Sequence, residues 1–336
     1  MDPSSSRKKA PAWFAATKAF EAPSRWRATL QLIDTLGPFL TIGVAAAFLS
    51  RAGVPWYVLS ALAVFGGLFM VRLFILFHDC CHGSFWASRK TNAVWGWILG
   101  VLVYTPFKSW RKAHGTHHAH NGNLDQRGVG DVWTLTLEEY RRASPARRFQ
   151  YRLYRNPVFL FLFSPPLLFL FLQRLPDKGA SRQELRSVHI TTVCVLAMLG
   201  GIGWLAGWAF LLAYALPMIY VAAVAGVWLF YVQHQFDPGY WEHEDRWDPY
   251  TAALDGSSFY RLPAWAQWFS GNIGFHHIHH LRPHIPNYRL QACLRAVPEL
   301  QLPHPLTVWA SFKGLTLHLW DEKAQRLLSF HQAAHA

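Results

Sequence analysis

Residues 55–82 read PWYVLSALAVFGGLFMVRLFILFHDCCH, an apolar run that leads directly into two histidines. Arg72 is the only charged residue between Pro55 and Phe77. A helix needs about 20 largely apolar residues to cross the hydrocarbon core of a bilayer, so this run predicts a transmembrane helix. His78 and His82 follow at positions i and i+4, which share one face of a helix. The stretch therefore predicts a span whose end presents two imidazoles together.

Three further runs meet the same criterion for a transmembrane helix. They lie at about residues 32–49, 188–205 and 208–232, and the four runs pair along the chain as two hairpins. Two shorter apolar stretches, 93–107 and 158–172, are interrupted by prolines, and we expect them to be interfacial or re-entrant. The predicted fold class is an all-α integral membrane protein with four transmembrane helices.

The composition agrees with a membrane protein and disfavours other classes. Of the 336 residues, 52% are hydrophobic and 15% are charged, whereas a soluble domain has about a quarter of its residues charged. A cytosolic enzyme, a disordered chain and a disulfide scaffold are therefore each disfavoured. The four cysteines show no paired spacing, and the adjacent Cys80 and Cys81 are badly placed to bridge each other. We expect reduced thiols.

The basic residues predict which side of the membrane each segment faces. Lys and Arg number six in residues 1–30, sixteen in 82–187 and eight after residue 232, whereas the two hairpin turns carry only Arg51. By the positive-inside rule, both termini and the histidines face the cytoplasm. The first thirty residues do not resemble a cleaved signal peptide. We expect a cytosolic N-terminal tail at 1–30, a membrane and catalytic domain at 31–297, and a cytosolic C-terminal tail at 298–336.

The net charge of +13 has two interpretations. It can serve orientation in the lipid bilayer and attraction to anionic headgroups. It can also form a landing patch for an acidic protein partner or a phosphate-bearing substrate. Nucleic acid is disfavoured as a partner, because no nucleic-acid motif accompanies the charge.

Three more histidine segments lie on the same predicted side. They read HGTHH at 114–118, QHQ at 233–235 and HHIHH at 276–280. Each HxxHH segment can present three imidazoles on one helical face. With the first pair this makes eight nitrogen ligands: His78, His82, His114, His117, His118, His276, His279 and His280. Structural zinc uses four ligands and catalytic zinc three, so eight predict two metal ions. Imidazole suits iron, zinc, copper and nickel alike, which leaves the metal open.

Several side chains near these segments are candidates to orient the ligands. A metal-bound histidine usually donates its second ring nitrogen to a carboxylate or a carbonyl. The candidates are Asp79, Asp125, Asp131, Asp237 and Asn272, and ordinary turn or capping roles are the alternative. His277 lies between ligand positions but faces another side of the helix, and the spacing of His234 by itself does not demand a metal.

The histidine segments as a set resemble the membrane fatty acid desaturases of the acyl-lipid or omega type. The matching stretches are HDCCH (78–82), WRKAHGTHH (110–118) and GNIGFHHIHHLRPHIPNY (271–288), in that family's order and membrane placement. NLDQRGVGDVWTLTLEEY (123–140) and GSSFYRLPAW (256–265) further resemble bacterial members that act on acyl chains of membrane lipids. The resemblance covers roughly residues 70 to 290, and this set of motifs is highly specific.

The resemblance implies a mushroom-shaped fold, with four spanning helices as a stem and a cytosolic helical cap that holds a di-iron site of two non-haem irons. The family's ligands carry over to the eight histidines above, and His234 falls where the family keeps an additional histidine. In the acyl-CoA branch, an Asn one helical turn before that histidine holds a water on one iron. Phe230 stands there in this chain, so a tenth ligand is not carried over.

The implied reaction removes two hydrogens from adjacent methylenes of an acyl chain, consumes O2 and two electrons, and leaves a cis double bond. An unactivated methylene has no acidic proton, so we expect no catalytic residue beyond the metal ligands. The sequence shows no flavin, nicotinamide or fused haem motif, so we expect an external ferredoxin- or cytochrome-type donor on the basic cytosolic face. The implied substrate is an acyl lipid, and the implied location is a bacterial inner membrane.

Two alternatives stay open. Hydroxylases, epoxygenases, acetylenases and carotenoid oxygenases share these histidine segments, and spacing does not separate them from desaturases. A histidine-rich metal transporter is a more remote alternative, because transporters usually place ligands or charges within their spans, and these spans have almost none.

Overall fold

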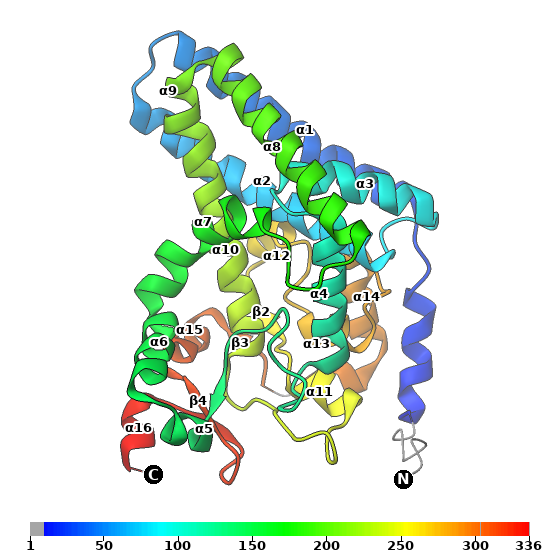
Figure 1. The fold of residues 1–336 in the computed structure, drawn as a ribbon. Coiled ribbons are helices and arrows are strands. Elements are labelled where there is room, and N and C mark those ends of the chain that lie inside the picture. The colour runs from blue at the N-terminus through cyan, green and yellow to red at the C-terminus, as the bar shows by residue number, and fades with distance from the viewer. Residues whose placement is uncertain (1–9, 303, 336) are drawn as a thin grey trace.

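The computed structural model describes residues 10–302 and 304–335, and within them the protein is mostly helical. Four segments are long and apolar enough to cross a membrane: α1 (Arg25–Arg51), α2 (Trp56–His82), α8 (Arg182–Ala206) and Trp208–His234. The last comprises α9 (Trp208–Phe210), a π-helical stretch (Leu211–Ala215) and α10 (Leu216–His234). The four segments extend from a body of short helices toward the top of Figure 1. They correspond to the four predicted runs.

Local sequence sets where these helices begin and end. The Ser24 side chain accepts the N–H of Arg27 at the start of α1, and Ser181 forms a capping box with Glu184 at the start of α8. α2 ends at His82 and is followed by Gly83, whose φ of 73° is the left-handed conformation that glycine adopts readily. Each helix is longer than its predicted apolar run. The additional residues are mostly polar and lie chiefly at the end nearer the body of short helices.

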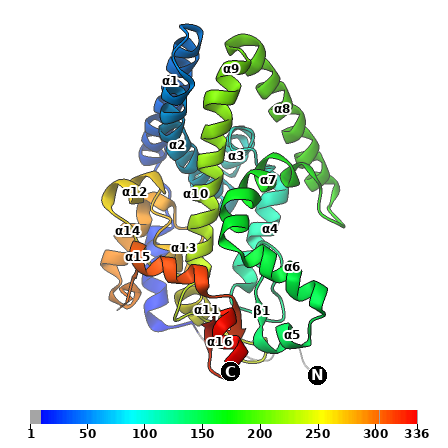
Figure 2. The ribbon, with the colours of Figure 1, turned by 90° about the vertical axis from the view of Figure 1, so that its left-hand side faces the viewer.

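α2 and α10 form the centre of the helical upper part. α2 packs against α1, α3 and α10, and 50% of its most apolar window is buried, compared with 17% for α1. Gly67 allows the close approach of α2 to α10, since a Cβ there would lie 2.7 Å from Val221 Cγ1. Figure 2 shows α10 descending from α9 to the level of α13 (His276–Leu281). The body ends of α2 and α10 therefore both reach the histidine-bearing layer.

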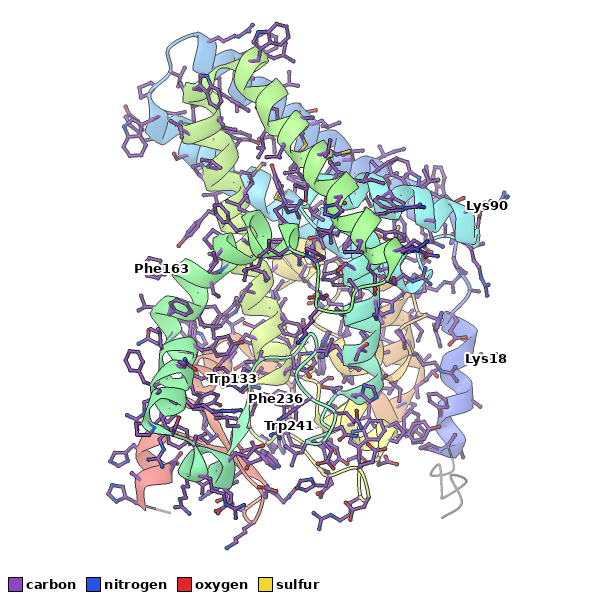
Figure 3. All side chains as sticks on the ribbon, in the orientation of Figure 1. Lys18, Lys90, Trp133, Phe163, Phe236 and Trp241 are labelled. Carbon is purple, nitrogen blue, oxygen red and sulfur yellow. The ribbon has the colours of Figure 1, made fainter. Side chains whose placement is uncertain are left out.

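The two shorter apolar stretches do not form straight spans. The first becomes α3 (Arg89–Leu102). The second becomes a π-helical turn (Phe159–Phe163), α7 (Ser164–Leu170) and a 3₁₀ turn (Leu172–Arg174). With α6 (Pro145–Arg155), it forms a helix pair bent by 63°, a broken span or a re-entrant loop by length and composition. Figure 3 shows Lys90 at the outer edge of α3 and Phe163 pointing outward on the opposite edge of the molecule. Phe163 is 62% exposed, which suits contact with lipid.

The body consists of short helices and two small sheets. Its helices include η1 (Ala12–Phe20), α4 (Phe107–His120), α5 (Leu137–Arg142), α11 (Pro249–Asp255), α12 (Ala264–Phe269), α13, α14 (Asn287–Ala296), α15 (Val308–Ser311) and α16 (Phe330–His335). One sheet has the order β1 (Leu135–Thr136), β4 (Leu319–Asp321), β5 (Arg326–Leu328), and the other pairs β2 (Tyr260–Arg261) with β3 (Leu306–Thr307). The body brings segments far apart in sequence beneath the spans.

The C-terminal segment, expected as a tail at 298–336, is folded into the body over its described residues. β3 pairs in parallel with β2, and β4 pairs in parallel with β1. Leu319 and Trp320 are fully buried: Leu319 belongs to the apolar cluster that contains Tyr151, and Trp320 belongs to another that contains Trp241. Of the expected N-terminal tail, η1 packs against α14, while residues 1–9 lie outside the described part of the chain.

Candidate metal centre

The first histidine segment lies on the last turns of α2. His78 and His82 are one turn apart, and their ring centroids are 4.7 Å from each other. Because α2 continues beyond its apolar run, it carries both rings out of the span and into the body. The sequence prediction of two imidazoles on one helical face is confirmed by this geometry.

The second segment lies on α4 and supplies two different groups. His114 and His118 point to one side, with their Nε2 atoms 3.1 Å apart. His117 points to another side, where its Nε2 atom lies 3.1 Å from that of His234. All three imidazoles that the HxxHH spacing predicts thus enter the candidate metal centre, but they are divided between two groups. Positions i+3 and i+4 lie on opposite sides of position i around the helix, so they reach different neighbours.

The third segment forms α13 and is divided in the same way. His279 Nε2 lies 3.0 Å from His118 Nε2, whereas His276 Nε2 lies 3.0 Å from His234 Nε2. His280 joins the latter, with its Nε2 atom 3.1 Å from that of His276. His277 turns away and contacts the carbonyl oxygen of Leu300 through Nε2.

The histidines therefore gather into two compact groups. The first group is His78, His82, His114, His118 and His279; the second group is His117, His234, His276 and His280. Within each group the candidate ligand atoms all lie within 4.8 Å of one another. Each group combines helices from distant parts of the chain, and α4 and α13 contribute to both. All nine histidines singled out from the sequence are thus brought together.

Hydrogen bonds at the second ring nitrogen show why a cation fits the second group. His117 Nδ1 lies 2.5 Å from an Asp131 carboxylate oxygen, and His234 Nδ1 lies 3.4 Å from the carbonyl oxygen of Gly256. Both acceptors require a proton on Nδ1, so in the neutral rings both Nε2 atoms carry lone pairs. These two Nε2 atoms are 3.1 Å apart with no proton to share. Facing lone pairs repel, and a metal cation between them would turn that repulsion into coordination.

Burial keeps the imidazoles of the body helices in the neutral form. Desolvation, reinforced by neighbouring imidazoles, lowers the pKa of His114, His118, His276, His279 and His280 well below the ordinary histidine value. Neutral imidazole is the form that coordinates metal ions. These five side chains are therefore suited to act as neutral donors to a metal ion.

Two of the five predicted orienting residues contact group histidines. Asp79 Oδ1 lies 3.2 Å from His78 Nδ1, and Asp131 contacts His117 as described above. The other three do not: Asp125 bonds to His243, Asp237 pairs with Lys313, and the Asn272 amide donates to the carbonyl oxygen of Asn287. Closeness in sequence did not show which of the five residues contact a histidine group. The contacts of each side chain depend on the path of its loop through the body.

Two neighbours of the groups were not assigned a role from the sequence. Asn287 donates to Asp79 Oδ2 through its backbone N–H, at 2.7 Å, and through its side-chain amide, at 2.8 Å. It thereby supports the carboxylate that holds His78. Asn287 lies in the segment HIPNY, so the sequence contained the residue but not its partner. Trp110 stacks on His114 with 4.2 Å between ring centroids.

Aromatic rings line the side of the first group that faces the spans. Trp110 lies 5.2 Å from Phe77 and 5.5 Å from Phe74 between ring centroids. Phe230, where the acyl-CoA branch has Asn, lies 5.1 Å from His234 and 5.5 Å from His117. An apolar ring therefore occupies the position from which the acyl-CoA branch would supply a tenth ligand.

Several known proteins are similar to this chain over most of its length. A family model described as fatty acid desaturase matches residues 54–312. A fatty acid desaturase from Bacillus subtilis (strain 168) is 39% identical over 94% of this chain and 90% of its own. A probable fatty acid desaturase from Sorghum bicolor is 31% identical over 81% of this chain and 71% of its own. An sn-1 acyl-lipid omega-3 desaturase (ferredoxin) from Synechocystis is 29% identical over 77% of this chain and 73% of its own.

Proposed function

The chain belongs to the fatty acid desaturase family and is an oxidoreductase, and from that premise we propose that it inserts a cis double bond into an acyl chain of a membrane lipid. The reaction consumes O2 and two electrons at a centre of two metal ions. The observation that carries this proposal is the division of nine histidines into two groups, with the Nε2 atoms of His117 and His234 only 3.1 Å apart.

Two non-haem irons are the metals that we assign to the two groups. His78, His82, His114, His118 and His279 would hold one ion, and His117, His234, His276 and His280 the other. Iron bound there would supply the reductive activation of O2 that an unactivated methylene requires. Asp79 and Asp131 hold His78 and His117 in the tautomer that leaves Nε2 free for the metal.

The surrounding residues bind the substrate and exclude water. Phe74, Phe77 and Trp110 form an apolar wall between the spans and the first group. A saturated acyl segment packs favourably against such rings, because contact with them removes its apolar surface from water. Phe230 extends the apolar surface to the second group. These rings would orient adjacent methylenes toward the metals.

Four spanning helices in two hairpins, with the body on the cytoplasmic side, form the proposed topology. The distribution of Lys and Arg supports this orientation, because the turns far from the body carry only Arg51. η1 and α16 lie at the same end of the molecule as the histidine-bearing helices in Figure 1. The bacterial inner membrane stays a prediction.

An external electron-carrier protein is the proposed partner. The name of the Synechocystis relative includes ferredoxin, and the sequence of this chain shows no electron-carrying cofactor motif. The exposed basic side chains of α4, including Arg111 and Lys112, lie on the helix that carries His114 and His118. An acidic ferredoxin- or cytochrome-type protein would be attracted to this surface.

The fatty acid profile of cells that express the protein tests the proposed reaction. We expect a new double bond, located by mass spectrometry, that is absent in cells expressing His117→Ala. His120→Ala is the matched control, because His120 lies on the same helix but contacts the Thr116 carbonyl oxygen and neither histidine group. Hydroxylated acyl chains in place of unsaturated ones would contradict desaturation and favour a hydroxylase on the same scaffold.

A further inference from the structure

A polar groove of about 420 Å³ lies between the start of α1 and the outer face of α14. Its polar lining consists of Arg27, Asn272, Tyr288, Gln291 and Arg295. None of these residues belongs to the histidine groups or to the aromatic wall. The volume is within the range of small-molecule sites. Figure 1 shows α14 in the body below the end of α1 from which that helix enters the upper part.

The charge of the groove favours an anion. Two guanidinium groups, Arg27 and Arg295, line it, and no carboxylate does. Among the residues that the structure describes, neither guanidinium forms an ion pair; Arg27 Nη1 has only a 3.5 Å contact with the Tyr288 carbonyl oxygen. The planar fork of arginine matches phosphate oxygens in a two-point contact. Two arginines without an ion-pair partner among the described residues, together with amide side chains, suit the binding of a phosphate group.

The position of the groove relative to the membrane indicates the source of that phosphate. Arg27 lies in the first turn of α1, and Trp26, Leu30 and Ile33 on the same helix are exposed apolar residues. An exposed tryptophan beside an arginine, followed by lipid-facing aliphatic residues, is typical of the headgroup level of a membrane. Trp265 of the nearby α12, 63% exposed, adds a second aromatic residue of this kind. The groove therefore opens where the headgroups of the cytoplasmic leaflet would lie.

We propose that this groove binds the headgroup phosphate of a glycerophospholipid and so holds the acyl lipid that the enzyme acts on. The role of the bound lipid as substrate rests on the proposed function. The binding of the lipid in the groove does not. Asn272, which lines the groove, donates to the Asn287 carbonyl oxygen. Asn287 in turn donates to Asp79, which contacts His78. The same hydrogen-bonded residues thus connect the groove to the first histidine group.

Binding of a short-chain phospholipid to the metal-loaded full chain tests the proposal directly. The probe is dioctanoyl phosphatidylglycerol, and its dissociation constant is measured by calorimetry in detergent. We expect Arg27→Gln combined with Arg295→Gln to weaken binding about tenfold or more, because two charge-assisted contacts are lost. Arg182→Gln is the matched control, an exposed arginine in the first turn of α8, another predicted span. It should leave the dissociation constant unchanged.

Competition experiments distinguish the lipid from other phosphates. Dioctanoylglycerol, which lacks the phosphate, should bind at least about tenfold more weakly than the phospholipid to the wild-type protein, and equally weakly to the double variant. Equal displacement of the phospholipid by inorganic phosphate would show a free-anion site, and equal displacement by coenzyme A would show a thioester-carrier site. Either result, or an unchanged dissociation constant in the double variant, would overturn the assignment.

Turnover in nanodiscs then separates this site from the proposed reaction. The double variant should raise the apparent KM for phospholipid about tenfold while kcat stays close to that of the wild type. Phospholipid binding that depends on both arginines in a protein without desaturase activity would reject the reaction and keep the site. An unchanged KM with normal activity would reject the site and keep the reaction.

Discussion

At the scale of single residues, two aspartates of one loop have different tasks. Asp131 Oδ1 contacts His117 Nδ1, and its Oδ2 accepts the N–H of Gly128. Asp125 instead contacts His243 Nδ1 at 2.8 Å and accepts the N–H of Glu244. Glu322 on the far side of the imidazole, together with Asp125, raises the pKa of His243. Asp131 therefore serves the second histidine group, whereas Asp125 holds loops of the body together.

Replacing these two aspartates separates the tasks. We expect Asp131→Ala to lower metal affinity about 10- to 100-fold, because His117 loses the acceptor that fixes its tautomer and orientation. The iron bound per chain is measured after dialysis against graded concentrations of chelator. Asp125→Ala is the control from the same loop and should retain wild-type iron. Equal iron retention in both variants would show that Asp131 does not orient a ligand.

At the scale of elements, one asparagine joins three helices. The side chain of Asn287 on α14 exchanges hydrogen bonds of 2.7 and 3.0 Å with Gln31 on α1. It also donates to Asp79 on α2. All three side chains are buried, so water cannot satisfy their polar atoms and these hydrogen bonds do so instead. These bonds fix α1 and the body end of α2 relative to α14.

Removing this junction should destabilise the fold. We expect Asn287→Leu to lower the free energy of unfolding by about 1–3 kcal/mol, because the buried Asp79 carboxylate and the Gln31 amide both lose a partner. Gln31→Leu should have a smaller effect, since Asn287 keeps its bonds to Asp79. Thermal unfolding of the metal-loaded protein in detergent measures both. A larger loss for Gln31→Leu than for Asn287→Leu would contradict the central role of Asn287.

At the scale of the whole molecule, charge and apolar surface are separated. The net charge is +13, yet the four predicted spans contain few basic residues, so the cationic side chains concentrate in the body and at its boundary. This separation serves orientation in the membrane. It also creates a positive field over the side from which an electron carrier would approach.

Salt dependence of reduction tests the proposed docking of an acidic carrier. Raising ionic strength from 0.1 to 1 M shortens the Debye length from about 10 to about 3 Å. We expect the second-order rate constant for reduction by an acidic ferredoxin to fall about tenfold or more. Reduction by an uncharged hydroquinone is the control and should change little. A rate with ferredoxin that is independent of salt would reject electrostatic docking.

Local patterns in the sequence already predicted much of this molecule. The length of each apolar run predicted the four candidate spans, because crossing a bilayer depends on consecutive residues alone. The spacing of His78 and His82 predicted a shared helical face, because the helical repeat is also a local property of the chain. The resemblance to the desaturases supplied His234, which spacing did not demand, and the family comparisons confirm that resemblance.

Only the tertiary structure decided how these parts combine. It assigned His117 to a different group from His114 and His118, selected Asp131 over Asp125, and folded the expected C-terminal tail into the body. It also placed Arg27 beside Arg295, two residues that no sequence pattern connects. The physical reason is common to all four: each depends on which helices and loops cross in space, and contacts between distant segments are set by the packing of the whole chain.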